Sequence, residues 1–107
     1  MFEARQLTEH GKIYLDAANL LEKKGWCQNQ ASDPFNRVCM AEALHRATYG
    51  SQESVNMNTV SDTRAWKLPY EALTKFIGRD AIRWNDTIGR TKAEVIEKLR
   101  EAAYNPS

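Results

Sequence analysis

Residues 81–103 read AIRWNDTIGRTKAEVIEKLREAA, and the second half of this stretch carries the clearest helix signal in the chain. Thr91 followed by Glu94 is the pattern of a capping box, in which the hydroxyl and the carboxylate each accept a hydrogen bond from an otherwise unpaired amide. The apolar residues beyond the box recur at the spacing of one buried helical face: Val95, Ile96, Leu99, Ala102 and Ala103. The stretch therefore predicts a C-terminal helix that packs one side against a core.

The same apolar spacing predicts three more helices upstream. One covers about residues 5–24, with Gly11 weakening its first part so that the secure portion begins just after that glycine. The others cover about 38–48 and 69–77, and the short segment 79–84 fits one further helical turn. About four helices with one long connection indicate a compact all-α single domain spanning residues 1–107.

The segment between the first two helices, WCQNQASDPFNR at 26–37, is rich in polar and turn-forming residues. It lacks the apolar alternation of a hairpin. We expect an ordered loop pinned by Trp26 and Phe35, with the indole N–H of Trp26 bonded to a carbonyl oxygen.

Residues 50–66 are predicted to form a long polar excursion from the core. They contain few large apolar residues and show no clear period. Because a long loop inside a compact domain is usually functional or mobile, this segment is a candidate partner-binding surface. The residues that would carry the contacts are Val55, Met57, Val60, Arg64 and Trp66.

The composition indicates a soluble globular protein without a global charge preference. Of the 107 residues, 42% are hydrophobic and 27% charged, and the net charge is +1. Such a charge gives no signal for nucleic acid or anionic lipid, and no apolar run approaches the roughly 20 residues that span a bilayer. The N-terminus lacks the order of a signal peptide, so we expect a cytoplasmic location. There Cys27 and Cys39 would stay reduced.

Thiol and imidazole side chains give little support for a metal or a nucleophile. Cys27, Cys39, His10 and His45 form no close pair of the CxxC or HxxxH type, so we expect neither a metal nor a cofactor. A Cys/His hydrolase stays an alternative. Six residues place Cys39 and His45 about 120° apart around a helix and about 9 Å along it, which argues against that pair. This argument does not apply to a pair of Cys27 with His45, because Cys27 is not on the predicted helix that carries His45.

A local group of cations is a candidate site for a small anion or a nucleotide. Arg79, Arg83, Arg90 and Lys92 flank the start of the last helix, where amides attract negative charge. The competing interpretation is a solvated, salt-bridged surface, because Asp80 and Asp86 lie among these cations.

The tripeptide Trp84-Asn85-Asp86 looks most like a motif, yet turn chemistry accounts for it. Asn85 and Asp86 are expected to bond nearby backbone groups before the capping box. Gly89 would relieve the chain, and Trp84 would fill the core. We therefore interpret these residues, together with Trp26, Cys39, Thr91 and Glu94, as structural.

Three stretches together resemble a small domain family of unknown function from actinobacteria and their phages: LLEKKGWCQ, RVCMAEALHRA and AIRWNDTIGRTKAEVIEKLREAA. The shared residues are Gly25 and Trp26, then Cys39, Ala43 and Leu44, then Trp84, Asn85 and Asp86, then Arg90, Thr91, Glu94 and Val95. The resemblance covers about residues 13–103 and leaves 50–66 unmatched. Glu42 departs from it, because the family pattern has glycine there and so allows close backbone packing.

The resemblance implies a phage-related setting and assigns no activity. Combined with the all-α frame and the lack of a catalytic set, it leads us to expect a non-enzymatic phage-type accessory protein. Such a protein would bind and modulate a host or defence-system protein in the host cytoplasm. The two alternatives are a signal-sequestering protein that binds a nucleotide or small anion, and the Cys/His hydrolase.

Overall fold

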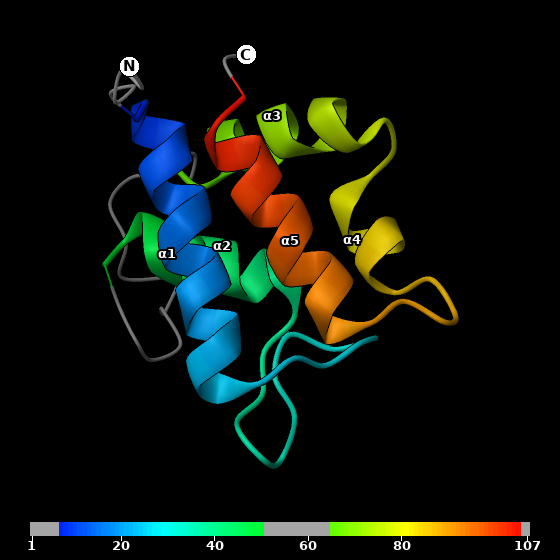
Figure 1. Ribbon diagram of the computed structural model, residues 1–107. Coiled ribbons are helices and arrows are strands. Elements are labelled where there is room, and N and C mark those ends of the chain that lie inside the picture. The colour runs from blue at the N-terminus through cyan, green and yellow to red at the C-terminus, as the bar shows by residue number, and fades with distance from the viewer. Residues whose placement is uncertain (1–6, 51–64, 106–107) are drawn as a thin grey trace, which may run out of the picture.

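The computed structural model describes residues 7–50 and 65–105. Within these ranges the backbone forms five helices and no strand (Figure 1). They are α1 Glu9–Lys24, α2 Met40–Thr48, α3 Lys67–Ile77, α4 Ala81–Asn85 and α5 Lys92–Ala103. The predicted all-α fold is confirmed, and the single turn expected at 79–84 is the five-residue helix α4. None of these helices is long and apolar enough to cross a membrane.

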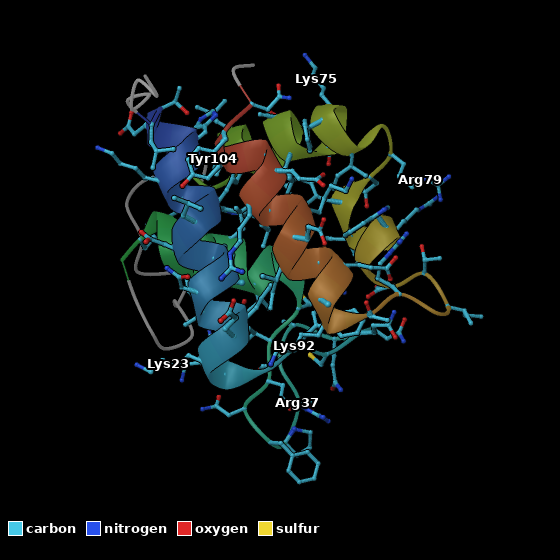
Figure 2. The ribbon with its side chains drawn as sticks, viewed as in Figure 1. Lys23, Arg37, Lys75, Arg79, Lys92 and Tyr104 are labelled. Atoms are coloured by element: carbon cyan, nitrogen blue, oxygen red, sulfur yellow. The ribbon has the colours of Figure 1, made fainter. Side chains whose placement is uncertain are left out.

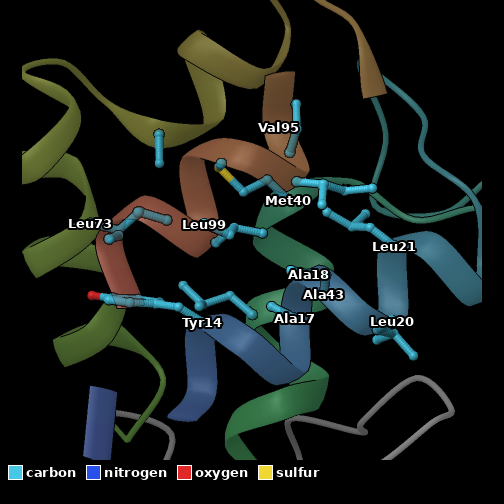
Figure 3. Close-up of a cluster of buried hydrophobic side chains, with 14 of the residues drawn as sticks. Tyr14, Ala17, Ala18, Leu20, Leu21, Met40, Ala43, Leu73, Val95 and Leu99 are labelled. Atoms are coloured by element: carbon cyan, nitrogen blue, oxygen red, sulfur yellow. The ribbon is translucent and has the colours of Figure 1, made fainter. Parts of the chain in front are cut away.

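Helices α1 and α5 lie side by side and run in opposite directions, while α2 packs against α1 (Figure 1). The shorter helices α3 and α4 pack against α2 and against each other. Fully buried side chains from α1, α2, α3 and α5 meet in one core (Figure 3): Leu21, Met40, Leu73, Val95 and Leu99. Burial of these apolar side chains is the main stabilising contribution to the fold.

Helix α5 follows its sequence pattern closely. Both hydrogen bonds of the capping box are present between Thr91 and Glu94. All five apolar residues that the spacing placed on one face are buried. The start signal and the unbroken apolar stripe thus make this helix predictable from its own sequence, and packing of the stripe in the core stabilises it.

Helix α1 begins at Glu9, within the predicted range 5–24 and ahead of Gly11, after which its secure portion was expected. Thr8 is the N-cap and accepts a hydrogen bond from the Gly11 amide at 2.9 Å, so Gly11 lies inside the helix. A Cβ atom on Gly11 would lie 2.6 Å from the carbonyl oxygen of Ala103 in α5. Gly11 is therefore a point of close backbone approach between α1 and α5, which offsets its poor helix propensity.

Replacing Gly11 with alanine is expected to lower the free energy of unfolding by about 1–3 kcal/mol. Alanine would gain about 1 kcal/mol of helix propensity, but the backbone carbonyl of Ala103 cannot rotate away as a side chain could. Urea denaturation at neutral pH measures the difference. A stabilised Gly11→Ala variant would show that α1 and α5 can move slightly apart without a loss of stability.

The loop from Gly25 to Cys39 is tied down by backbone hydrogen bonds. The Cys27 amide donates to the Val38 carbonyl at 3.1 Å, and the Val38 amide donates to the Gly25 carbonyl at 3.0 Å. Trp26 packs against the core as expected. Phe35 does not: it is 77% exposed at the tip of a turn, with only the guanidinium of Arg37 over its ring. The prediction that Phe35 pins the loop is wrong.

Candidate functional site

Asn85, in the Trp84-Asn85-Asp86 segment, joins three separate parts of the chain. Its Oδ1 accepts hydrogen bonds from Trp26 Nε1 at 2.6 Å and from the Met40 amide at 3.1 Å. Its Nδ2 donates to the Cys27 carbonyl at 3.3 Å. The side chain is 1% exposed, so these bonds form out of water. Asn85 thus holds the Gly25–Cys39 loop and the start of α2 against α4.

The residues around Asn85 extend this connection. Gln28 Nε2 donates to the carbonyl oxygens of Asn85 and Thr87, each at 2.9 Å. Asp86 Oδ1 accepts from the Asn29 amide and from Asn85 Nδ2, each also at 2.9 Å. The expectation that Asn85 and Asp86 bond mainly to nearby backbone is therefore wrong, because most of their partners are 45–59 residues away.

Beside this network lies an open groove of about 430 Å³, which we call the Trp66 groove. It is bounded by the Gly25–Cys39 loop, the first turns of α2, the start of α3 and helix α4. Its lining residues are Asn29, Gln30, Ala31, Cys39, Ala41, Glu42, His45, Trp66, Ile82, Asn85 and Asp86. One end is therefore formed by the same Asn85 and Asp86 that organise the fold.

Trp66 is the one predicted partner-binding residue that the structure describes. Trp66 directly precedes α3, which begins two residues before the predicted start. The Trp66 and His45 rings contact each other edge to face, with 5.3 Å between their centroids. The Trp66 indole Nε1 is buried and has no hydrogen-bond partner, the one such side-chain atom in the described ranges. Val55, Met57, Val60 and Arg64 lie outside the described residues.

Both thiols are occupied in structural hydrogen bonds. Cys39 is the N-cap of α2, and its Sγ accepts from the Glu42 amide at 3.3 Å. The single S–H of Cys27 is shared between the carbonyl oxygens of Gln30 and Arg37, which lie 3.5 and 3.4 Å from Sγ. Burial raises the pKa of Cys27 to about 11 and also raises the pKa of Cys39. At neutral pH both remain protonated, which is the opposite of what a nucleophilic cysteine needs.

His45 lines the groove together with Cys39 and is 7% exposed. Burial is the main cause that lowers its pKa below the ordinary value of 6.5, while the nearby carboxylate of Glu42 raises it in part. The imidazole is therefore neutral at neutral pH.

The buried imidazole predicts a pH-dependent stability. In the unfolded chain His45 takes up a proton near pH 6.5, whereas the folded protein resists protonation. Its contribution to the free energy of unfolding is thus present above about pH 6.5 and is lost as the pH falls below that value. Urea denaturation between about pH 7.5 and pH 5.5 should show this decline in wild type and a flatter profile in His45→Gln. Equal slopes would assign the decline to other groups.

A family model described as a family of unknown function, DUF6197, matches residues 6–105. The chain belongs to the DUF6197 family. The match spans nearly the whole sequence, residues 50–66 included, and the family description assigns no activity to this DUF6197 protein. No curated protein and no solved structure matches it.

The four cations predicted to bind an anion are not gathered into one site. Arg90 Nε donates to the Trp84 carbonyl at 3.0 Å, and its guanidinium lies 3.9 Å from the centre of the Trp84 ring. Arg79 and Arg83 are exposed near α4. Lys92 lines a different hollow, beside Glu22 and Glu97. Figure 2 shows Arg79 and Lys92 at well-separated places on the molecule.

Possible metal ligands are also scattered. No group of three or more His, Cys, Asp or Glu side chains in the described part of the chain is placed to hold a metal ion. Among the described residues, the buried side-chain polar atom without a hydrogen-bond partner is Trp66 Nε1, and Trp66 lines the Trp66 groove.

Proposed function

We propose that this DUF6197 protein is a non-enzymatic binding protein and that the Trp66 groove receives a segment of a partner protein. The observation that carries the proposal is the buried indole N–H of Trp66, which lines an open groove and has no acceptor among the described residues. A buried donor without an acceptor costs about 1–3 kcal/mol. A partner that supplies an acceptor recovers this energy, and tryptophan is frequent at the energetic centre of protein interfaces.

The chemistry of the groove supports binding over catalysis. A Cys/His hydrolase needs a thiolate or a thiol that a base can deprotonate. The Cys39 sulfur instead accepts an amide hydrogen bond at the start of α2, and burial raises its pKa. The single S–H of Cys27 is shared between two carbonyl oxygens of its own loop.

The alternative function, sequestration of a nucleotide or small anion, has weaker support. It requires Arg79, Arg83, Arg90 and Lys92 to act together. Arg90 is held against Trp84 and pairs with Glu94 at 3.5 Å, so it is not positioned for an external anion.

The setting of the proposed function comes from the sequence motifs. The resemblance to actinobacterial and phage domains implies a phage-related setting, and we propose that the partner is a host or defence-system protein in the host cytoplasm. An adaptor between two proteins of the same cell would use the groove in the same way.

Affinity purification with matched variants tests the proposal. Ile82 is 42% exposed and lines the groove, whereas Ile88 is 99% exposed and does not line it. From lysate of the organism that encodes the gene, we expect one or more proteins to co-purify with wild type and with Ile88→Asp. Their recovery should fall about tenfold with Ile82→Asp, as for loss of an interface anchor. Equal recovery with Ile82→Asp, or no retained protein at all, would contradict the proposal.

A further inference from the structure

We infer that the group received by the Trp66 groove is a basic side chain of the partner, an arginine above all. Asp86 would hold its charged end, and a neighbouring backbone carbonyl would accept from Trp66 Nε1. This inference rests on the proposed function and adds the chemistry of the partner.

The charge of the groove selects for a cation. Its described lining includes the carboxylates of Glu42 and Asp86, and none of the described residues that line it is a lysine or an arginine. Glu42 already pairs with Arg46, whose Nε lies 2.7 Å from Glu42 Oε2. Asp86 has no ion pair in the described part of the chain, so it supplies the net negative charge.

The negative charges of Glu42 and Asp86 act on Cys39, which lines the groove. Burial is the main cause that raises the pKa of Cys39, and the charges of Glu42 and Asp86 raise it further. His45 does not counter these negative charges, because burial keeps its imidazole neutral at neutral pH. The positive charge of Arg46 also reaches His45, but Arg46 is paired with Glu42. A guanidinium or an ammonium group would therefore be attracted chiefly by Asp86.

Asp86 is oriented in advance for such a contact. Its Oδ1 accepts two hydrogen bonds, from the Asn29 amide and from Asn85 Nδ2. No hydrogen bond to Oδ2 is present among the described residues, and Asp86 lines the groove, so we infer that Oδ2 is the oxygen that meets the partner's donor. Because the carboxylate is already fixed, a partner loses little free energy in ordering it, and a charge-assisted hydrogen bond is stronger than a neutral one.

An anion would find few donors in the same place. The amides at the start of α2 are already bonded: Met40 to Asn85 Oδ1, Glu42 to Cys39 Sγ and Ala43 to the Cys39 carbonyl. The unpaired buried donor is Trp66 Nε1, which suits the carbonyl oxygen of a peptide. The apolar stem of an arginine can lie along the rings of Trp66 and His45, as long cationic side chains do on aromatic surfaces.

Peptide titration followed by NMR tests the inference on the full chain. The ¹⁵N-labelled protein is titrated with Ac-Gly-Arg-Gly-NH₂ and with the same peptide containing citrulline, which has the shape of arginine without its charge. Three indole N–H signals serve as reporters, and that of Trp84 is an internal reference because Trp84 does not line the groove. We expect the arginine peptide to shift the Trp66 signal and to bind about tenfold more tightly than the citrulline peptide.

Two matched variants locate the charge. Asp86→Asn keeps an oxygen for the Asn29 and Asn85 hydrogen bonds and removes the negative charge, so it should bind the arginine peptide about tenfold more weakly. Glu97→Gln makes the same change in net charge on an exposed part of α5 and should bind as wild type does. A thermal melt of each variant verifies that it is folded. The citrulline comparison on wild type tests the charge independently of any substitution.

The inference is overturned by equal affinity for the arginine and citrulline peptides, by an unmoved Trp66 signal, or by an unchanged affinity in folded Asp86→Asn. In each of these cases the proposed function stands if Ile82→Asp still loses a co-purified protein. If the arginine peptide binds but no protein is retained by the groove, the proposed function and the partner side chain both fall, and the groove is a site for a small cation.

Discussion

Replacement of Asn85 by alanine is expected to lower the free energy of unfolding by about 3–4 kcal/mol. The amide makes four hydrogen bonds, with Trp26 Nε1, the Met40 amide, the Cys27 carbonyl and Asp86 Oδ1. Alanine would leave buried donors and an acceptor without partners, at about 1–3 kcal/mol for each group that water cannot reach. No other residue in α4 can replace these contacts, because they depend on one amide that both accepts and donates.

Chemical denaturation of wild type and Asn85→Ala measures this loss. Asn19→Ala is the matched control, since Asn19 is an exposed asparagine inside α1 and should change stability by less than about 0.5 kcal/mol. The Trp26 indole signal should also move in Asn85→Ala, because its acceptor is gone. A loss in Asn85→Ala no larger than that in Asn19→Ala would mean that water satisfies the freed groups.

The role of Asn85 shows where reasoning from local sequence ends. Turn propensity predicted a turn at Asn85 and Asp86, but Asn85 is the last residue of α4 and Asp86 is its C-cap. Turn propensity could not indicate that the Asn85 acceptors and donors meet Trp26 and Met40, which lie 59 and 45 residues away. Helices, by contrast, are set by residues three and four apart, so α5 could be predicted from its own stripe and cap.

The groove was missed for a similar reason. The sequence predicts a partner-binding role for Trp66 because it lies at the end of a polar segment. Glu42, His45 and Ile82, which also line the groove, belong to two other predicted helices. Nothing in their spacing indicates that the start of α2 meets the end of α4. The same holds for the cations of the predicted anion site: Arg83 and Arg90 are close in sequence, yet Arg90 folds back onto Trp84.

Glu42 is the residue at which this chain departs from the pattern that it resembles, and the structure gives the residue a definite role. Arg46, one turn later on α2, is 1% exposed, and its Nε lies 2.7 Å from Glu42 Oε2. A glycine at this position could not neutralise such a side chain. Glu42 also lies in the first turn of α2, where negative charge favours the helix.

Replacement of Glu42 by glutamine is therefore expected to lower the free energy of unfolding by about 3 kcal/mol, because it leaves the charge of buried Arg46 without this counter-ion. The matched control is Glu22→Gln, which breaks the exposed pair between Glu22 and Arg100 and should change stability by less than about 1 kcal/mol. Urea denaturation of both variants at neutral pH compares the two pairs directly. Equal, small losses would show that other contacts of Arg46 compensate its charge.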